Sequence, residues 1–406
     1  MSMDFDVLRA LDPRELGRRL QEARKARGQT QQQVAEHLGM ARTTITAIEK
    51  GERRILPSEL VQLAALYGRS VGELLRQSVP TAPFTVQLRA VLAPRMDVEG
   101  EVASDIVELE RLCSDYLELE RICGAPLLRK YPPQYQTEDV IPEAAGEDVA
   151  SAERNRLGLG DGPVLNLRDV LENDVGLRIF YVDLPSRIVE MFAYTEEFGG
   201  CLAINRKHPE ERRRMSMAHG YAHFLANRYR PEVALIGRYQ RVPEQERFAD
   251  AFARSFLMPE SGLRRRFNEL KRSRRGQFTP TDLCTLAYFY FVSVEALTLR
   301  LEELRLLPGD AWDRLQHAGF KVQGAKELPR LQPHPINSQK LPPRYLYLAA
   351  EALDRAEITE GQCARFLRMN RLEARQLVAD LASRTVISDE GTVSTVPLDL
   401  GESLSA

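Results

Sequence analysis

A run of short helical patterns separated by glycine and proline constrains the first fifth of this chain. Thr30 has the side chain of a helix N-cap, and Gly39 has the conformational freedom that a tight turn after a helix requires. Each pattern has one apolar face, which neighbouring helices must cover. These signals predict a five-helix bundle with helices over residues 13–27, 31–38, 41–50, 58–67 and 71–76.

The second and third of these helices, joined by the turn at Gly39, form a helix-turn-helix pattern. Short polar side chains project from the third helix, as insertion into the major groove of DNA requires. Arginine reads guanine edges, threonine offers a hydroxyl and a methyl group, and the start of the second helix suits phosphate contacts. The alternative is a helical bundle whose polar residues are merely solvated. The candidate DNA contacts are Gln31, Gln32, Arg42, Thr43, Thr44 and Thr46.

The stretch TQQQVAEHLGMARTTITAIEKGERRILPSELVQLA resembles the lambda-repressor-like (XRE) helix-turn-helix family. The resemblance covers the whole helical region and implies binding to double-stranded DNA, usually by a homodimer on a palindromic site. Charge adds little to this inference. Residues 1–78 carry 13 Lys and Arg against 10 Asp and Glu, and the whole chain has a net charge of −2.

A length of 406 residues predicts two or three domains. With 43% hydrophobic and 28% charged residues, the composition is typical of a soluble globular protein. No apolar run approaches the roughly 20 residues of a membrane-spanning helix, and the N-terminus lacks the apolar core of a signal peptide. We therefore expect a cytoplasmic protein without a membrane partner. Five scattered cysteines indicate small buried side chains rather than a disulfide or zinc-thiolate framework: Cys113, Cys123, Cys201, Cys284 and Cys363.

The expected fold is multidomain and mainly α-helical with a small β-sheet. Strand patterns at 177–182, 188–194 and 200–204 place the sheet in a central α+β domain. The predicted segments are a helix-turn-helix domain (1–78), a connector with a long helix (79–149), the central domain (150–326), a proline-rich linker (327–344) and a small helical domain with a tail (345–406).

Two of these segments leave alternatives open. The helix near 101–124 has apolar residues every three or four positions, so it either packs on the neighbouring domain or forms a dimer seam. Residues 342–381 resemble a helix-turn-helix but offer no polar positions that we can assign to bases, so we expect an interaction domain. We find no internal repeat of useful length.

His219 and His223 lie four residues apart in a helical stretch, so both imidazoles project from one face and are suited to bind one metal ion. Such a pair is more often two half-buried side chains. Glu246, on a second helical pattern downstream, adds a carboxylate. Two histidines and a carboxylate form the ligand set of a catalytic type of zinc site, which leaves a fourth position for water.

The stretches GGCLAINRKHPEERRRMSMAH and ERFADAFARSFLMP resemble the ImmA/IrrE family of metallopeptidases, with further similarity between about 150 and 320. Several members of that family also carry an XRE domain. The resemblance implies a zincin-like fold, zinc as cofactor and His219, His223 and Glu246 as ligands. It also implies a repressor as substrate, since members typically cut one.

The chain departs from the family pattern at Gly220, where the H-E-x-x-H motif has glutamate. That glutamate is the general base, and losing such a group costs on the order of 10²–10⁴ in rate. Gly220 therefore indicates a natural pseudo-enzyme, an engineered inactive variant or a base supplied from elsewhere, with Glu190 as one conceivable substitute. We expect that Gly220→Glu fits without backbone change and restores a peptidase.

The sequence favours a DNA-binding transcription regulator with a zinc metallopeptidase-like domain that lacks its catalytic base. One alternative is an active zinc metallopeptidase that cleaves a repressor or itself. Another is an antitoxin-like repressor that binds the product of a neighbouring gene.

Overall fold

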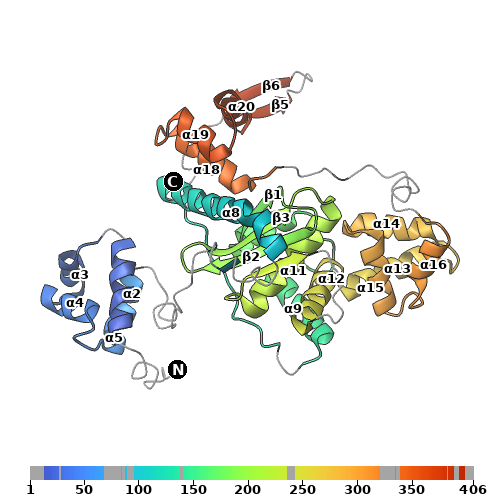
Figure 1. Ribbon diagram of the computed structural model, residues 1–406, viewed down its shortest axis with the longest axis horizontal. Helices are drawn as coiled ribbons and strands as arrows, with labels where there is room; N and C mark the ends of the chain where they lie inside the picture. The colour runs from blue at the N-terminus through green and yellow to red at the C-terminus, as the bar shows by residue number, and fades with distance from the viewer. Residues whose placement is uncertain are drawn as a thin grey trace. The chain divides into compact units, whose positions relative to one another are not determined.

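The computed structural model describes residues 13–26, 29–67, 84, 87–88, 96–137, 140–235, 243–320, 334, 339–381, 383–387 and 393–397. Contacts between Cα atoms divide the chain into two compact units, Met1–Pro80 and Thr81–Ala406. Figure 1 shows mainly helices and one small central sheet, as the sequence predicts.

The first unit has the helices α2 (Pro13–Ala26), α3 (Gln31–Leu38), α4 (Arg42–Glu49) and α5 (Pro57–Tyr67). Thr30 caps α3: its side chain accepts a hydrogen bond from the Gln33 backbone N–H, and its own backbone N–H donates to the Gln33 side chain. Gly39 ends α3 with a left-handed φ of 64°. These bounds agree with the predicted helices to within a residue, and the fifth predicted helix, 71–76, lies outside the described residues.

Helices α2 and α4 of this unit approach closely. A Cβ on Gly17 would lie 2.5 Å from the carbonyl oxygen of Ile48, so only glycine allows this packing. Arg24 and Glu49 form a buried ion pair of 2.6 Å between the same helices. The apolar core contains Leu16, Leu20, Ala23, Val34, Ala35, Ile45, Ile48, Leu60, Leu63, Ala64 and Tyr67.

The second unit is built around a four-stranded sheet in the order β1-β3-β2-β4. The strands are β1 (Arg178–Val182), β2 (Ile188–Thr195), β3 (Gly199–Asn205) and β4 (Glu232–Leu235). Strand β1 is parallel to β3, whereas β2 is antiparallel to both β3 and β4. The three predicted strands are confirmed, and the four-residue β4 has no counterpart among them.

Helices cover both faces of this sheet. Successive side chains of a strand point to opposite sides, and apolar side chains lie on both. Leu202 and Ile204 lie in a core with α9 (Pro142–Arg156), α11 (Glu210–Asn227) and α12 (Glu244–Leu257). Cys201 and Ala203 lie in a second core with α8 (Met96–Cys123) and α18 (Pro343–Asp354). The apolar stripe of α8 is thus buried inside this unit. All five cysteines are buried as free thiols.

The remaining helices and strands follow the sheet or connect to it. They are α10 (Leu167–Val170), which continues into a π-helical turn (Leu171–Val175), α13 (Glu260–Ser273), α14 (Pro280–Tyr290), α15 (Val294–Glu303), α16 (Ala311–His317), α19 (Glu360–Leu367), α20 (Arg371–Leu381), β5 (Ser383–Ile387) and β6 (Val393–Pro397). Strands β5 and β6 form an antiparallel hairpin that the sequence analysis does not predict. Most of the proline-rich linker lies outside the described residues.

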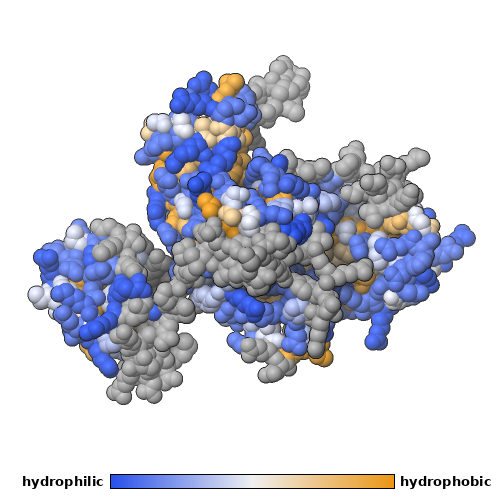
Figure 2. Space-filling model, in the orientation of Figure 1, coloured by the Kyte–Doolittle hydropathy of each residue, from blue (hydrophilic) through white to orange (hydrophobic). Residues whose placement is uncertain are grey.

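The visible face of the described residues is mostly hydrophilic in Figure 2. Among these residues, no single helix has the length and apolarity to cross a membrane; α14 and α15 reach that threshold only together, and they are bent by 101° at the break between them.

Candidate metal centre and DNA-binding helix

Helix α11 presents His219 and His223 one turn apart on the same face. Both residues are buried, with 9% and 6% of their surface exposed. Their ring centroids are 4.8 Å apart, and the rings are steeply inclined to each other. The helix therefore places two imidazole nitrogens in one enclosed space.

Helix α12 supplies Glu246 to the same space. One carboxylate oxygen lies 3.5 Å from Nε2 of His219, and the other lies 3.5 Å from Nε2 of His223. The three ligand atoms all lie within 4.8 Å of one another. Ligand atoms about 2.0–2.1 Å from a tetrahedral zinc ion are about 3.3 Å apart. The arrangement therefore brings together all three predicted ligands at a spacing that suits zinc.

The Nε2 atom of His223 is buried and makes no hydrogen bond within the part of the chain that the structure describes. Burial, together with the charge on His219, lowers the pKa of His223 to about 3. This imidazole is therefore neutral and keeps a lone pair, which a metal ion requires of a histidine ligand. Buried polar atoms in proteins are nearly always hydrogen-bonded. A buried nitrogen that faces a carboxylate without a hydrogen bond therefore fits a metal site better than a cluster of side chains that satisfy one another.

Glu190 on β2 binds the other side of the His219 ring. Its Oε1 lies 2.9 Å from Nδ1, and the Glu190 side chain is only 2% exposed. Burial raises the pKa of Glu190. Burial would lower the pKa of His219, but the Glu190 carboxylate outweighs it and raises this pKa well above its usual value, so a metal ion must displace the proton on Nε2 to bind there. A carboxylate on Nδ1 directs Nε2 of a histidine toward a metal.

Gly220 faces the sheet. A Cβ at this position would lie 2.3 Å from Cδ2 of Leu202 on β3 and 3.1 Å from Oε1 of Glu190. Leu202 is fully buried, so any side chain at position 220 must displace it. A glutamate here therefore requires the Leu202 side chain to move, whereas none of the three nearest contacts of the added Cβ is with backbone. The space beside position 220 is already filled by Leu202 and Glu190.

Asp250, one turn after Glu246 on α12, is a further carboxylate at this centre. Its Oδ1 lies 3.6 Å from Nε2 of His219, and 55% of its side chain is exposed. The four-residue spacing from Glu246 is the sequence signal that places it here, because residues i and i+4 share a helix face. Asp250 is thus on the ligand side of His219, whereas Glu190 is on the opposite side.

The predicted DNA contacts in the first unit differ in exposure. Arg42 and Thr43, at the start of α4, are exposed, and Thr44 is half-buried. Gln31 is tied to the fold, because its amide donates to Glu49 at 2.8 Å and accepts from the Thr46 hydroxyl at 3.0 Å.

Gln32 is exposed and donates to Glu36 at 2.8 Å. It therefore lies at the protein surface at the start of α3. Arg42, Thr43 and Gln32 are the three predicted contacts that lie open to a duplex.

Comparisons with known proteins agree with both parts of this description. Residues 15–77 match the family model of a helix-turn-helix domain. Residues 172–302 match that of the IrrE N-terminal-like domain, a peptidase family. The chain thus joins a helix-turn-helix domain to an IrrE-like, metallopeptidase-like domain.

No curated protein matches the chain. The crystal structure of ComR from Streptococcus suis is 10% identical, and the alignment covers 91% of this chain and 94% of that one. Its TM-score of 0.16 supports no conclusion about fold or function.

Proposed function

We propose that this protein is a transcription regulator that binds DNA through α4 and holds zinc in its metallopeptidase-like domain without cutting peptides. The observation that carries the proposal is the convergence of His219, His223 and Glu246 beside a position, Gly220, that has no carboxylate and where an added Cβ would crowd Leu202. Zinc, when bound, would supply a Lewis acid at these three ligands.

The chain's own residues hold the ligands in place. Glu190 keeps a proton on Nδ1 of His219 and so directs Nε2 into the site. Because this carboxylate binds the ring nitrogen that faces away from Glu246, it orients His219 and is poorly placed as a general base. A site with ligands but without a positioned base supports sensing or docking better than hydrolysis.

DNA binding rests on α4. Its start is exposed, Arg42 is suited to read a guanine edge, and the Thr43 side chain lies beside it. We propose that two chains bind a palindromic duplex, because a helix-turn-helix reads one half-site and two-fold symmetry supplies the second. Binding to DNA also implies a protein that works in the compartment that holds DNA.

The metal part is tested by zinc content. The full chain should retain about one zinc per chain after dialysis, and the double variant His219→Ala, His223→Ala should retain none. His317→Ala, on the exposed end of α16, is the matched control and should keep the zinc. Equal zinc in all three proteins would rule out this centre.

A second candidate function, peptide hydrolysis, is favoured by one observation. Asp250 places a half-exposed carboxylate 3.6 Å from Nε2 of His219, on the ligand side. If Asp250 serves as the base, the zinc-loaded chain cuts a repressor or itself, and Asp250→Asn slows cutting by about 10²-fold or more. Mass measurement of fragments decides between the two functions: intact protein and intact repressor support the non-cutting regulator.

A further inference from the structure

The C-terminal helices repeat the helix-turn-helix pattern of the first unit, so the expectation of no useful repeat is wrong. The segment TEGQCARFLRMNR (359–371) aligns without a gap with TQQQVAEHLGMAR (30–42). The identical pairs are Thr30 and Thr359, Gln33 and Gln362, Ala35 and Ala364, Leu38 and Leu367, Met40 and Met369, and Arg42 and Arg371.

The local structures match as closely as the sequences. Thr359 caps α19 in a reciprocal arrangement with Gln362, as Thr30 caps α3 with Gln33. Both α3 and α19 have eight residues, and each ends in the left-handed region, at Gly39 (φ 64°) and at Arg368 (φ 57°). The next helix begins three residues later in both cases, as α4 and as α20. The same turn therefore occurs twice in one chain.

The elements around this second turn complete a known kind of module. Helix α18 precedes α19 and α20, and the antiparallel hairpin β5–β6 follows them. Three helices followed by a two-stranded hairpin form a winged helix-turn-helix, in which the third helix enters the major groove and the hairpin lies beside it. Helix α20 is the third helix here.

The outer face of α20 carries side chains that suit base edges. Arg371, Leu372, Arg375 and Gln376 are all exposed, whereas Ala374 is buried against the rest of the module. Arginine pairs with guanine, glutamine pairs with adenine, and an apolar side chain packs on the thymine methyl group. Leu372 is 75% exposed, so its side chain is accessible to a thymine methyl group.

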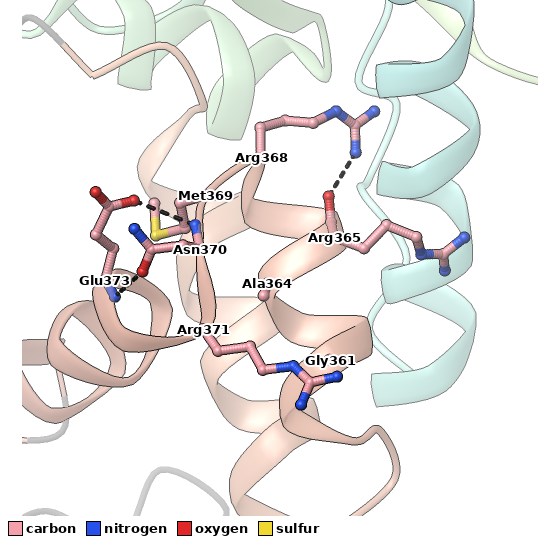
Figure 3. Close-up of a pocket in the computed structure, with 8 residues that line it drawn as sticks. All are labelled: Gly361, Ala364, Arg365, Arg368, Met369, Asn370, Arg371 and Glu373. Atoms are coloured by element: carbon pink, nitrogen blue, oxygen red, sulfur yellow. Dashed lines mark hydrogen bonds between the residues drawn. The ribbon is translucent and has the colours of Figure 1, made fainter.

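The charges near α20 single out Arg371. Figure 3 shows its side chain extending from α20 toward Gly361 at the start of α19, along an open groove. Within the described residues Arg371 forms no hydrogen bond or ion pair. Arg375 pairs with Glu360, and Arg368 pairs with Asp115 and Glu108 of α8.

Arg371 thus lies near the Glu360 carboxylate without forming an ion pair with it, at the position that Arg42 occupies in the first unit. The Arg368 pairs also tie this module to α8, and thereby to the sheet that carries Glu190.

We propose that residues 343–397 form a second DNA-binding module, a winged helix-turn-helix whose helix α20 reads the major groove of double-stranded DNA. This goes beyond DNA binding by α4, and it gives one chain two reading helices. A duplex that binds both α4 and α20 is then contacted by each chain at two separate stretches of base pairs.

Selection from random duplexes with the full chain, followed by hydroxyl-radical footprinting, tests the proposal. The double variant Arg371→Ala, Arg375→Ala should lose one protected segment and bind the selected duplex about 10- to 100-fold more weakly. Arg371→Lys keeps the charge, so it should retain the salt dependence but lose the base preference. Arg314→Ala, which removes an exposed arginine of α16, is the matched control and should change neither. Thermal melting shows whether each variant is folded.

The same footprints separate this proposal from the function of α4. Arg42→Ala should weaken a different segment and leave the α20 segment protected. If the α20 variants bind and protect the duplex as the wild type does, the second module is refuted while binding by α4 stands. Variants that change self-association and leave the footprint intact would show that α20 docks a second copy instead, which also overturns the proposal.

Discussion

Replacing Gly220 by alanine tests how tightly α11 packs on the sheet. Alanine inside a helix gains about 1 kcal/mol over glycine. Against this, the new Cβ would lie 2.3 Å from Cδ2 of Leu202, which is fully buried, and overpacking of this kind costs about 1–3 kcal/mol. The packing cost exceeds the helix gain, so Gly220→Ala should lower the free energy of unfolding by about 1 kcal/mol.

The assay is urea unfolding of the full chain, followed by the fluorescence of Trp312. This is the only tryptophan, and it packs partly buried against the core that contains Leu202. Gly100→Ala is the matched control, because Gly100 lies on α8 with nothing within 4 Å of an added Cβ. It should leave the Trp312 midpoint unchanged or raise it.

Leu202→Val in the same protein should relieve the contact, so Gly220→Ala becomes neutral or stabilising in that background. The coupling between the two changes should then be about 1 kcal/mol or more. If Gly220→Ala stabilises the protein in both backgrounds, the packing described at position 220 is refuted. Glutamate has the same Cβ, so Gly220→Glu meets the same contact and should recover cleavage only when Leu202 moves aside.

Two further changes give clear expectations. Arg42→Ala should cost about 1–3 kcal/mol of specific DNA binding and relax the preference at one base pair per half-site, which a competition titration over single-base variants of the selected duplex would measure. Burial, opposed in part by a hydrogen bond from Tyr116, raises the pKa of Glu172 from its ordinary value of 4.5 to about 7. The folded state therefore keeps a proton that the unfolded state loses, so this contribution to stability is complete below about pH 4.5 and falls by roughly 3 kcal/mol as the pH rises through 7. Glu172→Gln should flatten the decline of the free energy of unfolding, measured by urea unfolding from about pH 5 to 8. An unchanged dependence on pH would show that Glu172 is charged in the folded protein.

Local signals were enough to predict much of the fold. The cap at Thr30 and the turn at Gly39 fix α3 at its predicted bounds, since both act within one turn of helix. The convergence of the two histidines could also be predicted, because His219 and His223 share a helix face whatever surrounds them. The contacts that these residues make with side chains of other helices and strands could not be predicted in the same way. The contact of Gly220 with Leu202 depends on how α11 lies on β3, which no periodicity encodes.

The repeat at 359–371 is hard to find in the sequence because only six of its 13 positions are identical. The positions between them differ in chemistry: Gly39 corresponds to Arg368, which takes a left-handed φ without being glycine. The structure shows the correspondence because both segments adopt the same turn. The hairpin β5–β6 adds the context that a short helical pattern alone lacks.

Native mass spectrometry of the full chain with zinc and a selected duplex tests the central claim most directly, because it counts chains, zinc ions and duplexes in one complex. The account predicts two intact chains on one duplex, with one zinc ion per chain that disappears in the double variant His219→Ala, His223→Ala. A chain that binds no duplex, or one that holds the same zinc after both histidines are removed, would contradict it.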